Sequence, residues 1–141
     1  GIGFDVHRLV PKRKLYLAGL KIKSALGTLG HSDGDPVLHS IIDAILGACR
    51  LGDIGQMFSE KSKKFKNIRS TILLKKVIGQ IKSKGYFINN IDINIITQTP
   101  KINNLKNEQI LIQEMIQNIK MSGVIFTGDN LGYQNYYTIM K

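Results

Sequence analysis

The stretch HSDGDPVLHSIIDAIL, residues 31–46, predicts how the first half of the chain folds, because a helix start stands inside it. Asp35 precedes Pro36; aspartate caps free N–H groups, and proline is tolerated at the first helical position. A helix ending near Arg50 is therefore predicted, after a glycine-punctuated loop over residues 27–34. Its apolar stripe at helical spacing consists of Val37, Leu38, Ile41, Ile42, Ile45 and Leu46.

Outward from this helix, strand-like and helix-like patterns alternate, with a loop at residues 51–58. The predicted strands are residues 2–8, 15–22, 88–97, 123–126 and 136–140. Ser70 is expected to cap a helix through Lys84, and a third helix starts at Asn103 or Asn104 and ends near Lys120. This order predicts one α/β domain over residues 1–141, an α+β sandwich with helices on one face of a mixed sheet.

Composition limits the function without deciding it. The chain has 141 residues, 43% of them apolar, which is enough for a core and argues against disorder. Its formal charge of +10 fits either an anionic partner or a Lys-, Asn- and Ile-rich composition with no functional meaning. Cys49 is the single cysteine, which excludes an intrachain disulfide and suits a reducing compartment. No apolar run has the length of a membrane span.

The three histidines, His7, His31 and His39, all lie in the first 39 residues. Asp5 and His7 would share one face of a strand, and two imidazoles with a carboxylate form a common Zn²⁺ ligand set with an open position. Asp43 follows His39 by one helical turn, so it could orient that imidazole or face the site itself. The alternatives are a surface Asp–His pair, a core histidine and a surface charge.

Two glycine-flanked loops add polar groups. In HSDGD, residues 31–35, glycine would let backbone N–H groups approach an anion closely, just before a helix start. An ordinary Asx-type turn would explain Asp33 and Gly34 equally well, but it would not explain His31 and Ser32. In LGDIG, residues 51–55, the carboxylate of Asp53 could accept two sugar hydroxyls, or the segment could be a capping loop that follows a helix.

The blocks GFDVH, HSDGDPVLH and LGDIG, in this order, resemble 2-C-methyl-D-erythritol 2,4-cyclodiphosphate synthases of the non-mevalonate isoprenoid pathway, from Gly1 to about Leu131. The resemblance implies a phosphorus–oxygen lyase of terpenoid precursor biosynthesis. Its substrate would be 4-diphosphocytidyl-2-C-methyl-D-erythritol 2-phosphate, and its products the cyclic diphosphate and CMP.

The resemblance also implies roles for residues. Asp5, His7 and His39 would bind a metal, usually Zn²⁺, with Mg²⁺ or Mn²⁺ held at the substrate diphosphate. His31 and Thr127 would be catalytic. The residues implied to contact substrate are Asp5, Val6, His7, His31, Ser32, Asp53, Ile54, Gly55, Phe58, Glu60, Ser62, Thr97, Gln98, Thr99, Pro100, Lys101, Ile102, Thr127, Asp129 and Tyr133.

The chain departs from the family pattern in two places. FSEKS, residues 58–62, stands where Phe-Pro-Asp-Thr-Asp is usual, so Ser62 replaces a carboxylate. A C-terminal segment with a phosphate-contacting arginine is missing before YYTIMK.

The resemblance further implies a homotrimer with active sites between subunits. We expect a bacterial cytoplasm, or a plastid-type organelle if a targeting segment was removed. No nucleic-acid or membrane partner is expected. Two rival interpretations are an inactive metal-dependent nucleotide-binding module and a basic nucleic-acid-binding domain.

Overall fold

The computed structural model describes residues 1–97, 99–100 and the backbone of 120–128. It divides into two compact units, Gly1–Phe87 and Ile88–Lys141, and each is treated by itself. The first unit contains most of the predicted site residues.

Four short strands open the first unit and form two antiparallel pairs. Strand β1 (Leu9–Pro11) pairs with β4 (Leu26–Thr28), and β2 (Leu15–Leu17) pairs with β3 (Leu20–Ile22). The single strand predicted over residues 15–22 was wrong, because Ala18 and Gly19 both take positive φ and turn the chain into a hairpin.

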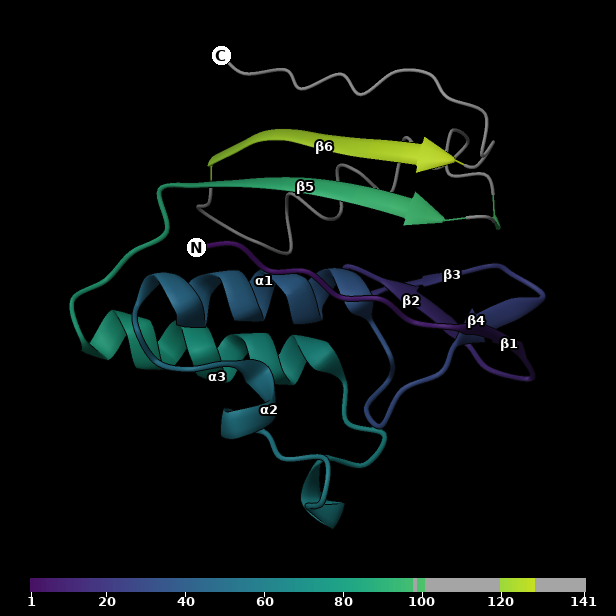
Figure 1. Ribbon diagram of the computed structural model, residues 1–141, viewed down its shortest axis with the longest axis horizontal. Coiled ribbons are helices and arrows are strands. Elements are labelled where there is room, and N and C mark those ends of the chain that lie inside the picture. Colours follow the sequence, from purple (N-terminus) through teal and green to yellow (C-terminus); the bar gives the residue numbers. More distant parts are fainter. Residues whose placement is uncertain (98, 101–119, 129–141) are drawn as a thin grey trace. The chain divides into compact units, whose positions relative to one another are not determined.

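The strand predicted over residues 2–8 was also wrong. These residues are extended but carry no strand hydrogen bonding in the described structure, and Figure 1 shows them running along helix α1 (Pro36–Ala48). Their alternation is nevertheless present, since Ile2, Phe4 and Val6 are exposed while Asp5 and His7 are partly buried. The two-residue period therefore placed both polar side chains on one face correctly, without a strand partner.

Helix α1 confirms the prediction built on Asp35 and Pro36. Asp35 accepts hydrogen bonds from the amides of Val37 and Leu38, and Pro36 is the first helical residue. The predicted apolar stripe is the buried face of the helix: Val37, Leu38, Ile41, Ile42, Ile45 and Leu46.

Helix α3 (Ser70–Ser83) lies beside α1, and their facing side chains form the core of the first unit (Figure 1). Ser70 is the first helical residue rather than the cap, because the carboxylate of Asp33, from the distant HSDGD loop, accepts its amide hydrogen at 3.1 Å. Leu73, Leu74, Val77 and Ile81 fill the α3 side of the core.

Between these helices, the predicted loop at residues 51–58 contains a one-turn helix, α2 (Ile54–Met57), and a short 3₁₀ turn follows at Lys63–Phe65. None of the described helices is long and apolar enough to cross a membrane.

The second unit contains a parallel pair, β5 (Asn90–Thr97) and β6 (Lys120–Gly128), with a bulge after Ile91. Strand β5 confirms the prediction over residues 88–97, and β6 is longer than the predicted 123–126. Lys120, expected at a helix end, is a strand residue. The predicted third helix, up to residue 119, and the strand at 136–140 lie outside the described residues.

The predicted mixed α/β class is confirmed, because the described elements include antiparallel strand pairs, a parallel strand pair and packed helices. The placement of helices on one sheet face and the single-domain boundary stay predictions.

Candidate metal centre and substrate site

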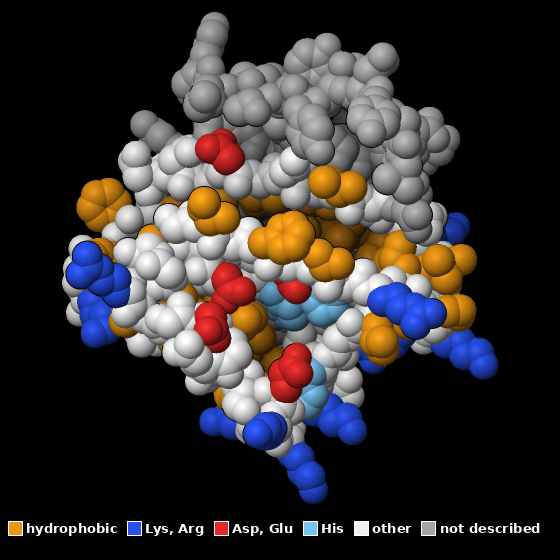
Figure 2. Space-filling model, viewed as in Figure 1, with side chains coloured by type: hydrophobic (Ala, Val, Ile, Leu, Met, Phe, Trp, Pro, Cys, Tyr) orange, Lys and Arg blue, Asp and Glu red, His pale blue; other side chains and the backbone are white. Residues whose placement is uncertain are grey.

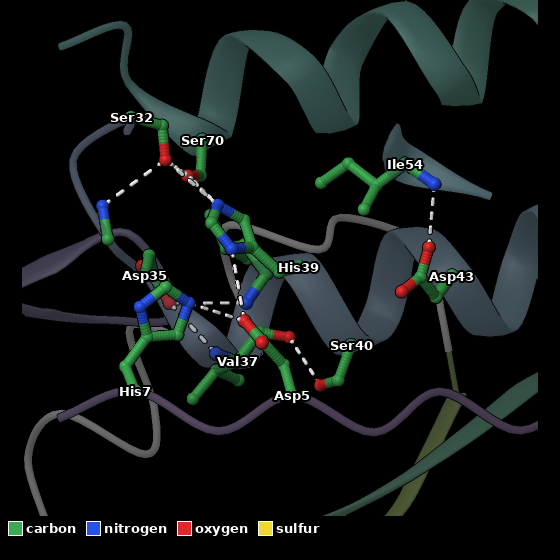
Figure 3. A network of polar contacts seen from close by, with 12 residues as sticks. Asp5, His7, Ser32, Asp35, Val37, His39, Ser40, Asp43, Ile54 and Ser70 are labelled. Atoms are coloured by element: carbon green, nitrogen blue, oxygen red, sulfur yellow. Dashed lines mark hydrogen bonds and ion pairs between the residues drawn. The ribbon is translucent and has the colours of Figure 1, made fainter. Parts of the chain in front are cut away.

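Two glycines bring the N-terminal segment close enough to α1 to form a site. A Cβ on Gly3 would lie 1.7 Å from the carbonyl oxygen of Ser40, and one on Gly1 would lie 1.9 Å from that of Ala44. No side chain fits at either position, so the backbone rests directly on the helix. Asp5 and His7 consequently lie next to His39, in the first turn of α1 (Figure 3).

The three predicted ligands converge on one point. The Oδ2 atom of Asp5 lies 2.8 Å from Nε2 of His7 and 3.0 Å from Nδ1 of His39. One ligand atom from each residue lies within 4.8 Å of the other two, and all three residues are partly buried. Figure 2 shows histidine and acidic side chains reaching the surface together on one face. The arrangement is a candidate metal-binding triad with access from outside.

The hydrogen-bond partners of the two His7 ring nitrogens show whether Asp5, His7 and His39 suit a cation. Its Nδ1 lies 2.6 Å from the carbonyl oxygen of Leu29, so that nitrogen must donate. Its Nε2 then faces the Asp5 carboxylate and needs either a second proton or a metal ion. The hydrogen bond with Asp5 accordingly raises the pKa of the His7 imidazole, against the effect of burial.

The Asp5 carboxyl is held in its charged form. Burial alone would raise its pKa, but the close polar contacts with His39 and His7 outweigh burial and lower the pKa well below the usual range. A carboxylate beside two imidazole nitrogens is a donor set that Zn²⁺ accepts, so the residues fit the predicted group.

The ring of His39 is fixed from the opposite side by two serines. Its Nε2 lies 3.0 Å from Oγ of Ser32 and 2.9 Å from Oγ of Ser70. Sequence reasoning missed Ser70 as part of the site, because the 31 residues that separate it from His39 leave no local signal.

The predicted contact between Asp43 and His39 is absent from the described hydrogen bonds. Asp43 instead accepts the amide hydrogen of Ile54 at 2.7 Å (Figure 3). The carboxylate therefore ties the LGDIG loop to α1. Asp43 thus positions residues 51–55, which the resemblance implies hold substrate hydroxyls, and has no described hydrogen bond to the His39 ring.

The polar residues of the HSDGD loop have separate partners. Asp35 is fully buried and accepts amide hydrogens from Ala18 and Gly19 as well as from α1, while desolvation raises its carboxyl pKa. Gly34 is required where it stands, because it has φ of +72° and an added Cβ would lie 2.8 Å from Oγ1 of Thr28. Nε2 of His31 lies 3.4 Å from the carbonyl oxygen of Ser62.

The remaining predicted contacts within the first unit come from residues 53–62. Asp53 is exposed and caps the start of α2 by accepting the amide hydrogen of Gln56 at 2.8 Å. Phe58 is buried, Glu60 is exposed, and Ser62 meets His31 through its carbonyl group rather than its side chain.

The other predicted contacts fall in the second unit. Oγ1 of Thr97 donates to the carbonyl oxygen of Thr99 at 3.0 Å, and Pro100 follows. Thr127 lies in β6, where only the backbone is described. Gln98, Lys101, Ile102, Asp129 and Tyr133 lie outside the described residues.

Comparison with known proteins gives one consistent result. The sequence model of the YgbB family matches residues 1–130. A bifunctional enzyme IspD/IspF of Pelagibacter ubique is 63% identical over 128 residues, covering 91% of this chain and 34% of that protein. This chain thus spans about a third of that relative's length.

A single-function relative matches along nearly its whole length. The 2-C-methyl-D-erythritol 2,4-cyclodiphosphate synthase of Clostridium beijerinckii is 46% identical over 142 residues, covering 94% of this chain and 90% of that protein. A solved structure of a 2C-methyl-D-erythritol-2,4-cyclodiphosphate synthase in its CDP-bound form matches with a TM-score of 0.81 and 31% identity, covering 89% of this chain and 85% of that one.

Proposed function

The chain belongs to the YgbB family of 2-C-methyl-D-erythritol 2,4-cyclodiphosphate synthases, and on that premise we propose that it performs the cyclisation itself. In the proposed reaction, the 2-phosphate of 4-diphosphocytidyl-2-C-methyl-D-erythritol 2-phosphate attacks the β-phosphorus. A new P–O bond closes the ring, the bond from the β-phosphorus to the bridging oxygen breaks, and CMP leaves with that oxygen. The product is 2-C-methyl-D-erythritol 2,4-cyclodiphosphate, so the enzyme is a phosphorus–oxygen lyase.

The convergence of Asp5, His7 and His39 beside the His31–Ser32 loop is the observation that carries this proposal. Both the nucleophile and the leaving group are phosphates, so the barrier depends on charge neutralisation and alignment. Asp5, His7 and His39 would hold Zn²⁺, which when bound supplies Lewis-acid polarisation of a phosphoryl oxygen.

The other residues of the chain bind and align the substrate. His31 and Ser32 face the phosphates, and Asp53, Ile54 and Gly55 hold sugar hydroxyls on a loop that Asp43 fixes. Thr97, Gln98, Thr99, Pro100, Lys101 and Ile102 form the cytidine pocket, and Thr127, Asp129 and Tyr133 complete the phosphate side. Mg²⁺ or Mn²⁺ binds at the substrate diphosphate, and Asp129 helps to hold that ion.

The assembly and location belong to the same proposal. We expect a homotrimer in which a neighbouring subunit contributes the cytidine pocket. The bacterial sources of the relatives favour the cytoplasm over a plastid-type organelle.

The proposal is tested by measuring CMP release from the substrate with metal-stripped protein, before and after Zn²⁺ and Mg²⁺ are restored. CMP should form only with divalent metal, and His39→Ala should lose both zinc, by elemental analysis, and turnover. A metal-loaded protein that binds CDP but yields no CMP would support the inactive binding module. Oligonucleotide binding that weakens steeply with salt and competes poorly with CMP would support the nucleic-acid interpretation.

A further inference from the structure

A buried polar chain leads away from the candidate metal ligand His39 into the core. Nε2 of His39 lies 2.9 Å from Oγ of Ser70, and Oγ of Ser70 lies 2.5 Å from Oδ1 of Asp33. Ser70 has no exposed surface, and the Asp33 side chain is 4% exposed. Polar groups at this depth need partners, so the direction of each hydrogen bond can be worked out.

Asp33 sets the direction of this chain. Its carboxylate forms an ion pair with Nε of Arg69 at 3.0 Å, although that N–H is not aligned as a hydrogen bond. A carboxylate can only accept, and a serine hydroxyl has a single hydrogen. The hydrogen of Ser70 is therefore given to Asp33, and Ser70 turns a lone pair toward His39.

A lone pair on Oγ of Ser70 requires a hydrogen on Nε2 of His39. Ser32 is compatible with this requirement, because its hydroxyl has two lone pairs. One accepts the amide hydrogen of Gly34 at 3.2 Å and the other can accept from Nε2, 3.0 Å away, while the hydroxyl hydrogen can point to Oγ of Ser70 at 3.5 Å. With Nε2 protonated, the other nitrogen, Nδ1, is the one free to bind a metal. That atom faces Asp5 and the candidate metal centre (Figure 3).

We propose that Asp33 and Ser70 are positioning residues that hold His39 as the Nε2–H tautomer, with its Nδ1 lone pair directed at the metal. This inference rests on the metal site of the proposed function and adds to it a buried partner from α3. Outer hydrogen bonds of this kind orient a ligating imidazole, and their removal typically lowers metal affinity about 10- to 100-fold.

The substitution Ser70→Ala isolates this role. It removes only the hydroxyl, and the backbone amide of residue 70 still donates to Oδ2 of Asp33, so the start of α3 keeps its cap. The matched control is Ser40→Ala, on α1 next to His39, because that hydroxyl donates to the carbonyl oxygen of Val37 instead of the ring. Asp33→Asn is the second variant, since its amide group could donate to Ser70 and reverse the chain.

The experiment measures zinc affinity by competition with a chromophoric chelator, and the imidazole N–H signals of ¹⁵N-histidine in the zinc-loaded protein. We expect zinc affinity about 10- to 100-fold lower in Ser70→Ala and Asp33→Asn, and unchanged in Ser40→Ala. The Nε2–H signal of His39 should be shifted downfield and protected from exchange in the original protein, and should lose both properties in Ser70→Ala.

Zinc affinity and an Nε2–H signal in Ser70→Ala equal to those of the original protein would overturn the positioning role and leave the metal site intact. If the unsubstituted protein bound no stoichiometric zinc, the metal site and this inference would both be overturned. Absence of CMP release alone would overturn only the proposed reaction, because neither readout here depends on turnover.

Discussion

Gly3→Ala should disrupt the metal centre without touching a ligand. The added Cβ would start 1.7 Å from the carbonyl oxygen of Ser40, and real Cβ contacts are essentially never shorter than 3.0 Å. The N-terminal segment must therefore retreat from α1 by about 1.3 Å or more. Asp5 lies two residues along that segment, and its Oδ2 is 3.0 Å from Nδ1 of His39.

Metal sites tolerate ligand displacements of only about 0.2 Å, so this shift should remove Asp5 from the coordination sphere. We expect zinc affinity to fall by more than about 100-fold, beyond the effect of losing an outer hydrogen bond. Overpacking of this kind also costs about 1–3 kcal/mol of folding free energy. Both effects follow from one methyl group at a position where the chain has no room for it.

The assay is chelator competition for zinc together with thermal unfolding of the metal-free protein. The matched control is Gly79→Ala in α3, where an added Cβ meets nothing within 4 Å. That variant should keep its zinc affinity and gain up to about 1 kcal/mol of stability from better helix propensity. Zinc affinity in Gly3→Ala within threefold of the original would refute the claim that this close contact positions Asp5.

Two further predictions concern the loop and the protons of the site. Asp43→Ala leaves the Ile54 amide without its charged acceptor, and such a hydrogen bond contributes about 1.5–3 kcal/mol. We therefore expect KM for substrate to rise roughly tenfold or more. Asp43→Asn keeps an acceptor oxygen and should recover most of the loss. Zinc affinity should not change in either variant, and a parallel loss of zinc would contradict the assignment of Asp43 to the loop. The second prediction is that zinc raises the unfolding temperature more at high pH than at low pH. In metal-free protein the charged His7–Asp5 pair stabilises the fold below pH 6.5, and this stabilisation is lost as the pH rises through the raised pKa of His7. Zinc binding, in contrast, needs the neutral His7 ring. Thermal unfolding with and without zinc between about pH 6 and 8.5 measures this, and an equal zinc-induced shift at both ends would count against a raised His7 pKa.

The sequence predicted α1 accurately, because every signal for it is local. Asp35, Pro36 and the apolar stripe act within a few residues of one another, and no distant contact is needed to define the helix start. The hairpin at Ala18 and Gly19 was missed because alanine seldom takes positive φ, and only the glycine hinted at a turn. The segment at residues 2–8 has the alternation of a strand, but alternation does not supply a strand partner.

The residue types of Asp5, His7 and His39 left a metal site and a surface Asp–His pair with a core histidine both open, and the resemblance to the family favoured the metal site. Its supports were not predictable. Helical spacing placed Asp43 near His39, yet the Ile54 amide, which arrives from the next loop, is its actual partner. Ser70 meets His39 and Asp33 only after α3 packs against α1, which is a tertiary event without a local signature.

The central claim is that Asp5, His7 and His39 together hold a divalent metal in a cyclodiphosphate synthase site. An anomalous difference map recorded at the zinc edge on crystals of the zinc-loaded protein tests it most directly. The account predicts a peak within bonding distance of a carboxylate oxygen of Asp5, Nε2 of His7 and Nδ1 of His39. A map with no peak there, or a peak coordinated by Nε2 of His39 in place of Nδ1, would contradict it.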